Sequence, residues 1–187
     1  MDIQDAQREM RRFYVGGFWG QLVSSAVWLV SATLGTWGSP KTSILAAVVG
    51  GFFIFPLTRL MLHLSSCRAS VSKENPLTSL GMQVAFVLPF SMLLLLPVGL
   101  YRLNWFFPAL MILLGAHYLP FATLYGMRVF LLLAGILISA GCVIAVYFAE
   151  TFSLGAWIGG LALFVFAWTG RSIATAEART QATGGPG

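Results

Sequence analysis

Long apolar stretches follow one another along the chain and are separated by short polar segments. A helix needs about 20 mostly apolar residues to cross the hydrocarbon core of a bilayer. Six stretches reach that length, and we expect spanning helices at 13–34, 43–64, 78–100, 105–124, 129–148 and 153–170. The strict alternation that is typical of membrane β-strands is absent. The pattern therefore predicts an all-α polytopic membrane protein, a bundle of six transmembrane helices.

The same pattern divides the chain into three parts. Residues 1–12 are predicted to form an amphipathic interfacial helix, because apolar side chains recur at helical spacing and acids precede arginines. Residues 13–170 form the six-helix transmembrane domain. Residues 171–187 are rich in Ala, Thr and Gly, which predicts a flexible C-terminal tail. The apolar stripe at the N-terminus consists of Ile3, Ala6, Met10 and Phe13.

Composition agrees with a protein whose solvent is lipid. Hydrophobic residues occupy 58% of the 187 positions and charged residues 9%, whereas soluble domains carry about 25% charged residues. Six acids and eleven bases are too few to cover a globule of this size. This argues against a soluble enzyme, a disordered chain and a nucleic-acid-binding domain. Membrane lipids are the expected partners, and nucleic acid is not.

The basic residues fall mainly on one side of the six-span arrangement. Nine of the eleven lie on the side of the N-terminus, and only Lys41 and Arg102 lie on the other. Lys and Arg accumulate in cytoplasmic loops, so we expect both termini in the cytoplasm. Arg59 lies just inside the membrane edge on that side, and we interpret it as snorkelling to the interface.

The spans hold almost no side chain that could catalyse a reaction or bind a metal. No Asp follows Asp5, and Glu150 at the outer end of 129–148 is the one Glu near a span, so a carboxylate proton relay is missing. The motifs His-Glu-x-x-His and Gly-x-Ser-x-Gly are absent, and Cys67 and Cys142 lack metal-ligand spacing. The sequence predicts no catalytic residue, no metal site and no cofactor.

His117 is the main candidate for a functional residue within a span. It lies about 12 residues into the fourth span, near the middle of the bilayer at 1.5 Å per residue. Pro120 cannot donate a hydrogen bond to the carbonyl of Ala116, and such irregular backbone usually lines protein or a cavity. With Tyr118 beside it, His117 fits a ligand-binding or proton-handling site. The alternative is a neutral histidine bonded to a neighbouring span.

Four further residues complete the candidate ligand-binding site. Gln21 and Gln83 lie within spans, where polar side chains normally turn inward and bond another helix. They serve either as packing contacts or as pocket lining. Arg102 and Asn104, between the third and fourth spans, form either a mouth that binds anions or lipid headgroups or an ordinary interfacial anchor.

Five short segments carry a resemblance to a known family. They are Gln7-Arg8-Glu9-Met10-Arg11, Tyr14-Val15-Gly16-Gly17, Glu74-Asn75-Pro76-Leu77, Asn104-Trp105-Phe106-Phe107-Pro108 and Gly115-Ala116-His117-Tyr118-Leu119. Together they resemble small bacterial integral-membrane proteins that are grouped under a domain of unknown function. The resemblance covers nearly the whole chain except the C-terminal tail. It implies a location in the bacterial inner membrane, and it implies no activity, substrate or catalytic residue.

Three functions are open on this basis. The first is binding or transport of a small neutral or weakly anionic solute, or of a lipid, between the first, third and fourth spans. In it His117, Gln21 and Gln83 lie inside, and Arg102 and Asn104 form the mouth. The second is a structural or accessory protein without a ligand, in which these side chains serve packing only. The third is an intramembrane enzyme that uses His117, against which the missing carboxylates and nucleophile motif argue. The sequence does not set the oligomeric state.

Overall fold

The computed structural model describes residues 1–65 and 71–183, and within them it is almost entirely helical. Six helical segments of this part are long and apolar enough to cross a membrane, which confirms the fold class expected from the hydrophobic pattern. In chain order the elements, with η for a 3-10 turn, are α1 (Ile3–Tyr14), η1 (Val15–Gly17), α2 (Phe18–Trp37), α3 (Pro40–Leu64), α4 (Leu77–Ser91), η2 (Met92–Leu94), α5 (Leu95–Tyr101), η3 (Leu103–Trp105), α6 (Phe106–Tyr125), α7 (Val129–Tyr147) and α8 (Leu154–Thr183).

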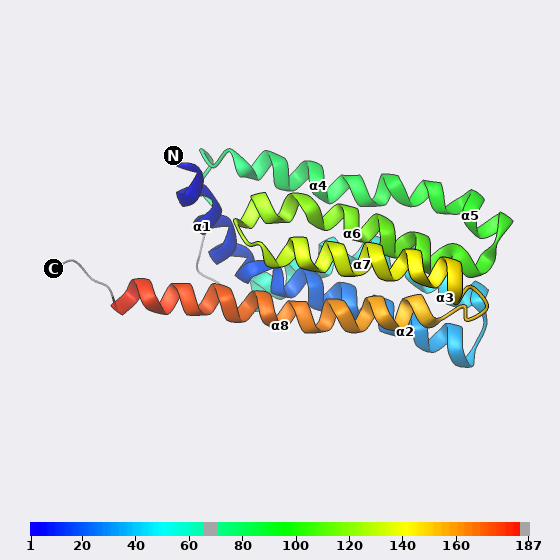
Figure 1. Ribbon diagram of the computed structural model, residues 1–187. Helices are drawn as coiled ribbons and strands as arrows, with labels where there is room; N and C mark the ends of the chain where they lie inside the picture. Colours follow the sequence, from blue (N-terminus) through cyan, green and yellow to red (C-terminus); the bar gives the residue numbers. More distant parts are fainter. Residues whose placement is uncertain (66–70, 184–187) are drawn as a thin grey trace.

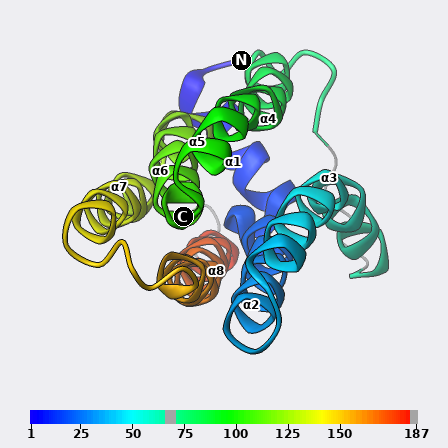
Figure 2. The ribbon, with the colours of Figure 1, turned by 90° about the vertical axis from the view of Figure 1, so that its right-hand side faces the viewer.

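The six spans form an open ring. α2 packs between α3 and α8, α7 packs between α8 and α6, and α6 packs against α4. Viewed along the bundle (Figure 2), the order around the ring is therefore α3, α2, α8, α7, α6 and α4. The third span is made of α4, η2 and α5 together. α3 and α4 are the two ends of the ring, and they barely touch each other.

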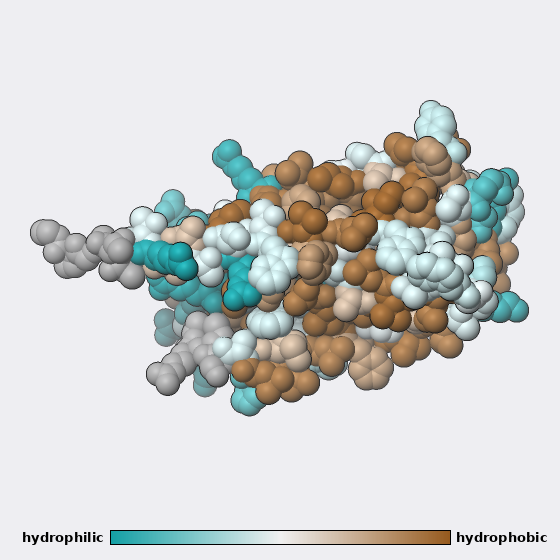
Figure 3. Space-filling view, turned by 90° about the horizontal axis from the view of Figure 1, so that it is seen from below, coloured by the Kyte–Doolittle hydropathy of each residue, from teal (hydrophilic) through white to brown (hydrophobic). Residues whose placement is uncertain are grey.

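The start of α1 and the end of α8 lie at one end of the bundle (Figure 1), which we call the terminal end. The connections at 37–40, 101–106 and 147–154 lie at the opposite end. On the face seen in Figure 3, the surface between the two ends is a wide apolar band. Large apolar side chains such as Phe52 of α3 and Phe90 of α4 are also exposed. Apolar surface of this extent needs lipid as its solvent. The chain is therefore a multi-pass membrane protein.

The first span begins later than its hydrophobic pattern predicts. Val15, Gly16 and Gly17 have φ angles of 51°, 63° and 81°, and this left-handed backbone separates α1 from α2. A Cβ on Gly16 would lie 2.5 Å from the carbonyl oxygen of Gly170 in α8, so only glycine allows this approach. The turn sends α1 across the terminal end of the bundle instead of along its axis (Figure 1).

The last helix is longer than expected. α8 continues to Thr183, so the residues 171–183, which we expected to be a flexible tail, are helical. The hydroxyls of Ser172 and Thr175 each donate to a carbonyl one turn earlier and so do not compete with the helix. Apolar periodicity stops at about 170, but alanine-rich sequence favours a helix without it.

The tightest packing is in the half of the ring away from α3 and α4. Phe107 of α6 is fully buried, and so are Phe130 and Leu133 of α7. On α8, a Cβ at Gly159 would lie 2.4 Å from the ring of Trp28 in α2, so the indole lies directly on bare backbone. Small residues of this kind allow membrane helices to approach closely. This half is closely packed, whereas the side of the ring between α3 and α4 is open.

Candidate ligand-binding pocket

A cavity of about 600 Å³ lies inside the open ring, between α2, α3, α4 and α6, and we call it the lateral pocket. Its volume falls within the range of about 300–1,000 Å³ that is usual for ligand sites. Along α4 and η2 it is lined from Gly81 to Met92, roughly 17 Å at 1.5 Å per residue. The pocket is therefore elongated parallel to the helices.

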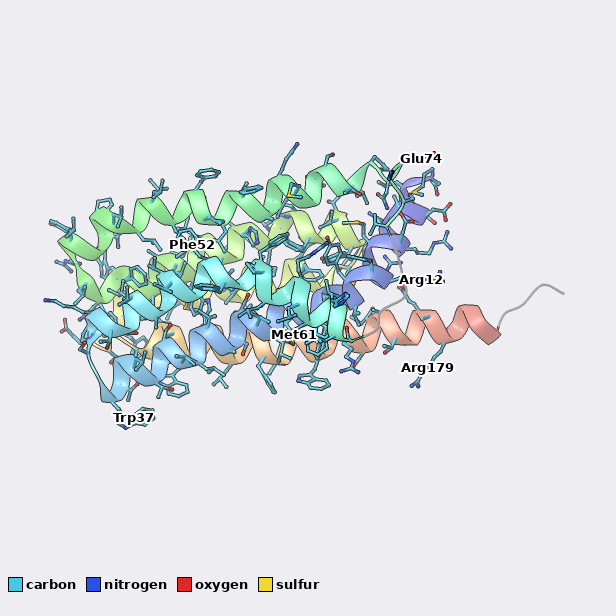
Figure 4. All side chains as sticks on the ribbon, turned by 180° about the vertical axis from the view of Figure 1, so that it is seen from behind. Arg12, Trp37, Phe52, Met61, Glu74 and Arg179 are labelled. Carbon is cyan, nitrogen blue, oxygen red and sulfur yellow. The ribbon has the colours of Figure 1, made fainter. Side chains whose placement is uncertain are left out.

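The lateral pocket opens sideways, through the gap between α3 and α4. Side chains that flank the gap line the pocket and are also exposed on the apolar band: Phe52, Phe55, Met82, Phe86 and Phe90. Phe52, which is 69% exposed, lies on the edge of α3 that faces α4 (Figure 4). A molecule in the pocket is thus continuous with the surface that lipid covers.

Small residues and prolines keep this pocket open. Gly20, Gly51 and Gly81 line it from three different helices, and a Cβ on any of them would meet no atom closer than 3.4 Å. Pro56 of α3 and Pro89 of α4 also line it. Each proline leaves a carbonyl one turn earlier without its helical donor. The glycines therefore leave space in the pocket that larger side chains would fill.

Two buried polar atoms in the pocket wall lack hydrogen-bond partners. Gln21 of α2 is 3% exposed, and its Oε1 atom accepts no hydrogen bond from any described residue. The Nδ1 atom of His117 in α6 is likewise buried and unpartnered in this part of the chain. An unsatisfied buried polar atom costs about 1–3 kcal/mol, and such atoms are rare in folded proteins. Both side chains line the lateral pocket, but the two unpartnered atoms themselves are covered by protein, so a bound molecule could reach them only after the side chains turn toward it.

An aromatic cluster surrounds His117. The centroid of its ring lies 5.8 Å from that of Tyr118 and 5.2 Å from that of Phe121. Phe121 in turn lies 5.6 Å from Tyr125 and 5.6 Å from Phe130. All five side chains line the lateral pocket. They make its α6 and α7 wall apolar except at the imidazole and the phenol hydroxyls.

The surroundings of His117 do not contain the parts of a hydrolytic centre. No hydroxyl, thiol or carboxyl group of the described residues is hydrogen-bonded to its Nδ1 atom, as an activated nucleophile would be. In the same residues no group of three His, Cys, Asp or Glu side chains is placed to hold a metal ion.

α1 closes the lateral pocket at the terminal end. Its buried face supplies Met10 and Tyr14 to the pocket lining. Gln7 holds the helix in place, because its Nε2 atom donates to the carbonyl of Thr123 in α6 at 2.7 Å. Arg11 donates in the same way to the carbonyl of Tyr125. α1 thus packs on the bundle with Ala6 and Met10 of its apolar stripe, which are buried, whereas Ile3 is exposed.

Glu9 ties α1 to the segment that leads into α4. Its carboxylate accepts hydrogen bonds from the Asn75 amide at 2.6 Å, from the Ser72 backbone N–H at 2.9 Å and from the Ser72 hydroxyl at 3.2 Å. The pKa of Glu9 is lowered, chiefly by the hydrogen bond from Asn75. The bonds from Ser72 lower the pKa further, and desolvation raises it in part. Asn75 also accepts from the backbone N–H of Leu77 at 2.9 Å, and so it orders the start of α4.

The lateral pocket brings together three of the six candidate ligand-binding residues. Gln21, His117 and Tyr118 all line it, from α2 and α6. These helices belong to the first and fourth spans, as expected. The pocket also uses the second span, α3, which the sequence-based hypothesis did not include.

The other three candidates lie elsewhere. Gln83 is exposed on α4 and does not line the pocket, although Ala85 two residues later does. Arg102 and Asn104 lie at the opposite end and also do not line it. The guanidinium of Arg102 lies 5.0 Å from the centre of the Trp105 ring, a cation–π contact that fits the interfacial anchor considered above. The pocket mouth is therefore not at the loop between α5 and α6.

Arg59, interpreted from the sequence as snorkelling to the interface, also lines the lateral pocket and was not among the candidate ligand-binding residues. It lines the terminal end of the lateral pocket, on the same helix as Phe52, Phe55 and Pro56. These four residues occupy positions i, i+3, i+4 and i+7 within an apolar segment and lie on one face of α3. An arginine in line with two pocket-facing aromatics is the signal that could have identified this surface.

Comparison with known proteins gives a family and no activity. A model of a family of unknown function, DUF7010, matches residues 3–171, which include α1 and all six spans. No curated protein matches the chain, and no solved structure matches it.

Proposed function

This chain belongs to the DUF7010 family, whose function is unknown, and we propose that it binds a lipid-like amphiphile that enters sideways from the bilayer. The observation that carries the proposal is the lateral pocket, a cavity of about 600 Å³ bordered by the exposed aromatic side chains of α3 and α4. A lipid reaches such a pocket without leaving the apolar phase. No aqueous path through the bundle is needed.

The shape of the pocket supports a long-chain ligand. It extends along the helices, in the direction in which acyl chains lie, and its walls are mainly aromatic and aliphatic. Burial of an apolar chain contributes about 0.8 kcal/mol per methylene relative to water. Inside a bilayer, however, the chain moves from lipid into the pocket and gains little from apolar burial. Selectivity must therefore come from polar contacts.

Gln21 and His117 can supply those contacts when their side chains turn toward the ligand, because both residues line the pocket. Gln21 lies about one turn from the start of α2, and His117 lies roughly 12 Å from the end of α6 at 1.5 Å per residue. The two side chains thus differ in depth by roughly 7.5 Å at 1.5 Å per residue, so a ligand would need two polar groups to satisfy Gln21 Oε1 and His117 Nδ1. A purely structural role favours side chains already bonded to a neighbouring helix, and these two atoms are not bonded in this way.

The orientation of the bundle is a part of the proposal. We infer that the terminal end faces the cytoplasm and that the membrane is the bacterial inner membrane. The basic residues of the described terminal end, including Arg8, Arg12 and Arg128, support this orientation through the accumulation of bases in cytoplasmic loops. Green fluorescent protein fused after residue 187 should fluoresce, whereas a periplasmic alkaline phosphatase fusion at the same site should be inactive. The reverse result would contradict the orientation.

Native mass spectrometry of the detergent-purified protein tests ligand binding. We expect co-purified lipid that survives gentle activation with the wild-type protein. Ala85→Phe fills the pocket from α4 and should abolish this retention. Gln83→Phe places the same side chain two residues away on the exposed side of α4 and should retain the lipid.

Two results would overturn the proposal. One is a wild-type protein that carries no lipid under conditions in which it stays folded. The other is equal lipid retention by the two phenylalanine variants, because lipid would then be held on the outer surface. Thermal unfolding of both variants verifies that each is folded before it is compared.

A further inference from the structure

Among the described residues that line the lateral pocket, Arg59 is the only Lys, Arg, Asp or Glu. It lies five residues before the end of α3 at Leu64, roughly 8 Å along the axis. It forms no ion pair with any residue in the described part of the chain. A guanidinium within an apolar segment is costly in a bilayer. Its charge must therefore either pair with an anion or reach the membrane interface.

The position of Arg59 relates the pocket to the depth of a lipid headgroup. The side chain is exposed and can extend to the interface, as arginines near helix ends do. Unlike an ordinary interfacial arginine, it shares its helix face with Phe55 and Phe52, which follow at intervals of one turn towards the middle of the membrane. One ligand can therefore contact the cation with its head and the two rings with its chain.

We propose that the lateral pocket selects a lipid with an anionic headgroup, whose phosphate or carboxylate binds Arg59 while one chain lies between α3 and α4. This rests on the proposed function, since it assigns the lipid class of the same pocket. No carboxylate is present among the lining residues that the structure describes, so nothing in the wall repels such a group. The neighbouring hydroxyl of Thr58 already donates to the Ile54 carbonyl at 2.7 Å, which leaves the charge contact to Arg59.

A competition experiment tests the headgroup selectivity. The delipidated protein is mixed with equal amounts of phosphatidylglycerol and phosphatidylcholine that carry the same acyl chains, and bound lipid is counted by native mass spectrometry. The phosphate of either lipid can bind the Arg59 guanidinium, but the quaternary ammonium of phosphatidylcholine compensates the phosphate charge, so the wild type should prefer the anionic lipid by about tenfold. Arg59→Gln should lose this preference and still bind lipid, and Arg59→Lys should keep most of it.

Two controls make the outcome specific. Arg128→Gln removes an exposed base at the same end of the bundle that does not line the pocket, and it should keep the wild-type preference. Excess glycerol phosphate, which has the headgroup charge without a chain, should not displace the lipid. Displacement by glycerol phosphate would show a plain anion site and would overturn the inference.

The remaining outcomes are decisive as well. If Arg59→Gln keeps the preference, or if Arg128→Gln loses it equally, Arg59 does not select the headgroup, although lipid binding itself stands. If the wild type binds neither lipid, the proposed function fails together with the inference. If Arg59→Gln binds both lipids equally and Arg128→Gln does not, the inference is confirmed.

Discussion

The Nδ2 atom of Asn75 lies 2.6 Å from Oε2 of Glu9, and this hydrogen bond joins α1 to the start of α4. The same nitrogen also donates to the carbonyl of Ala6 at 3.1 Å. One buried amide thus holds the helix that closes the lateral pocket at the terminal end. Because Met10 on α1 lines the pocket, loss of this bond should affect the pocket as well as stability.

Asn75→Ala should loosen α1. The substitution removes the main donor of Glu9 and the acceptor at the start of α4, so we expect the free energy of unfolding to fall by about 1–3 kcal/mol. Chemical unfolding in detergent measures the loss, and hydrogen exchange over residues 3–14 should become faster. Glu74→Gln, on an exposed neighbour, should change stability by less than about 0.5 kcal/mol. Unchanged exchange in α1 of Asn75→Ala would contradict this role.

Docking of α1 should weaken in acid. The pKa of Glu9 is lowered in the folded protein, so its contribution to stability is present above the unfolded-state pKa of about 4.3 and is lost as pH falls through the lower folded-state pKa. A spin label at exposed Gln4, in a cysteine-free background, should become more mobile below about pH 4.3. Glu9→Gln should show no transition in this range, and a transition of wild-type amplitude in that variant would assign the effect to another group.

Gly159→Ala should separate α2 from α8. The added Cβ would lie 2.4 Å from the ring of Trp28, and relief of such overpacking costs about 1–3 kcal/mol. Gly135→Ala in α7 is the matched control, because nothing lies within 4 Å of its added Cβ. Alanine in a helix interior then stabilises by about 0.5–1 kcal/mol relative to glycine. The two variants should therefore shift thermal unfolding in opposite directions, and a shift in the same direction would contradict the packing described for α8.

Gln21→Met should separate binding from packing. Because Gln21 Oε1 has no partner among the described residues, an apolar side chain of similar length should leave the lipid-free protein as stable or raise its stability by about 1–3 kcal/mol. Stabilisation by added lipid should decrease, since the ligand loses a hydrogen-bond partner. Thermal unfolding of the delipidated protein with and without lipid measures both effects. A large loss of stability in the lipid-free variant would favour the structural role.

The segments that cross the membrane could be predicted from the sequence because the length of an apolar stretch is a local property. All six expected spans correspond to helices that satisfy the same criterion in the structure. The errors lie at the boundaries. Because the backbone is left-handed at Val15–Gly17, the first spanning helix begins at Phe18. The helix continues after residue 170, where the sequence has no apolar periodicity from which it could be predicted.

The candidate site was only partly predictable, since burial in a spanning helix depends on rotation about its axis. Gln21 and Gln83 are equivalent as isolated amides within apolar segments, yet Gln21 lines the pocket and Gln83 is exposed. The neighbours of α4 decide this difference, and no local pattern records them. The same holds for Arg59, whose contact with the pocket follows from the separation of α3 and α4.

By itself, the sequence determined that the chain is an all-helical membrane protein with six spans, with few ionisable groups to support chemistry within them. Hydrophobic length and composition are sufficient for this, because the bilayer imposes the same requirement on every span. The tertiary structure decided that α3 and α4 fail to close the ring, that α1 closes one end of the opening, and that Gln21, His117 and Arg59 line one pocket. These features depend on how helix faces pack against one another, and residues far apart in the chain determine that packing.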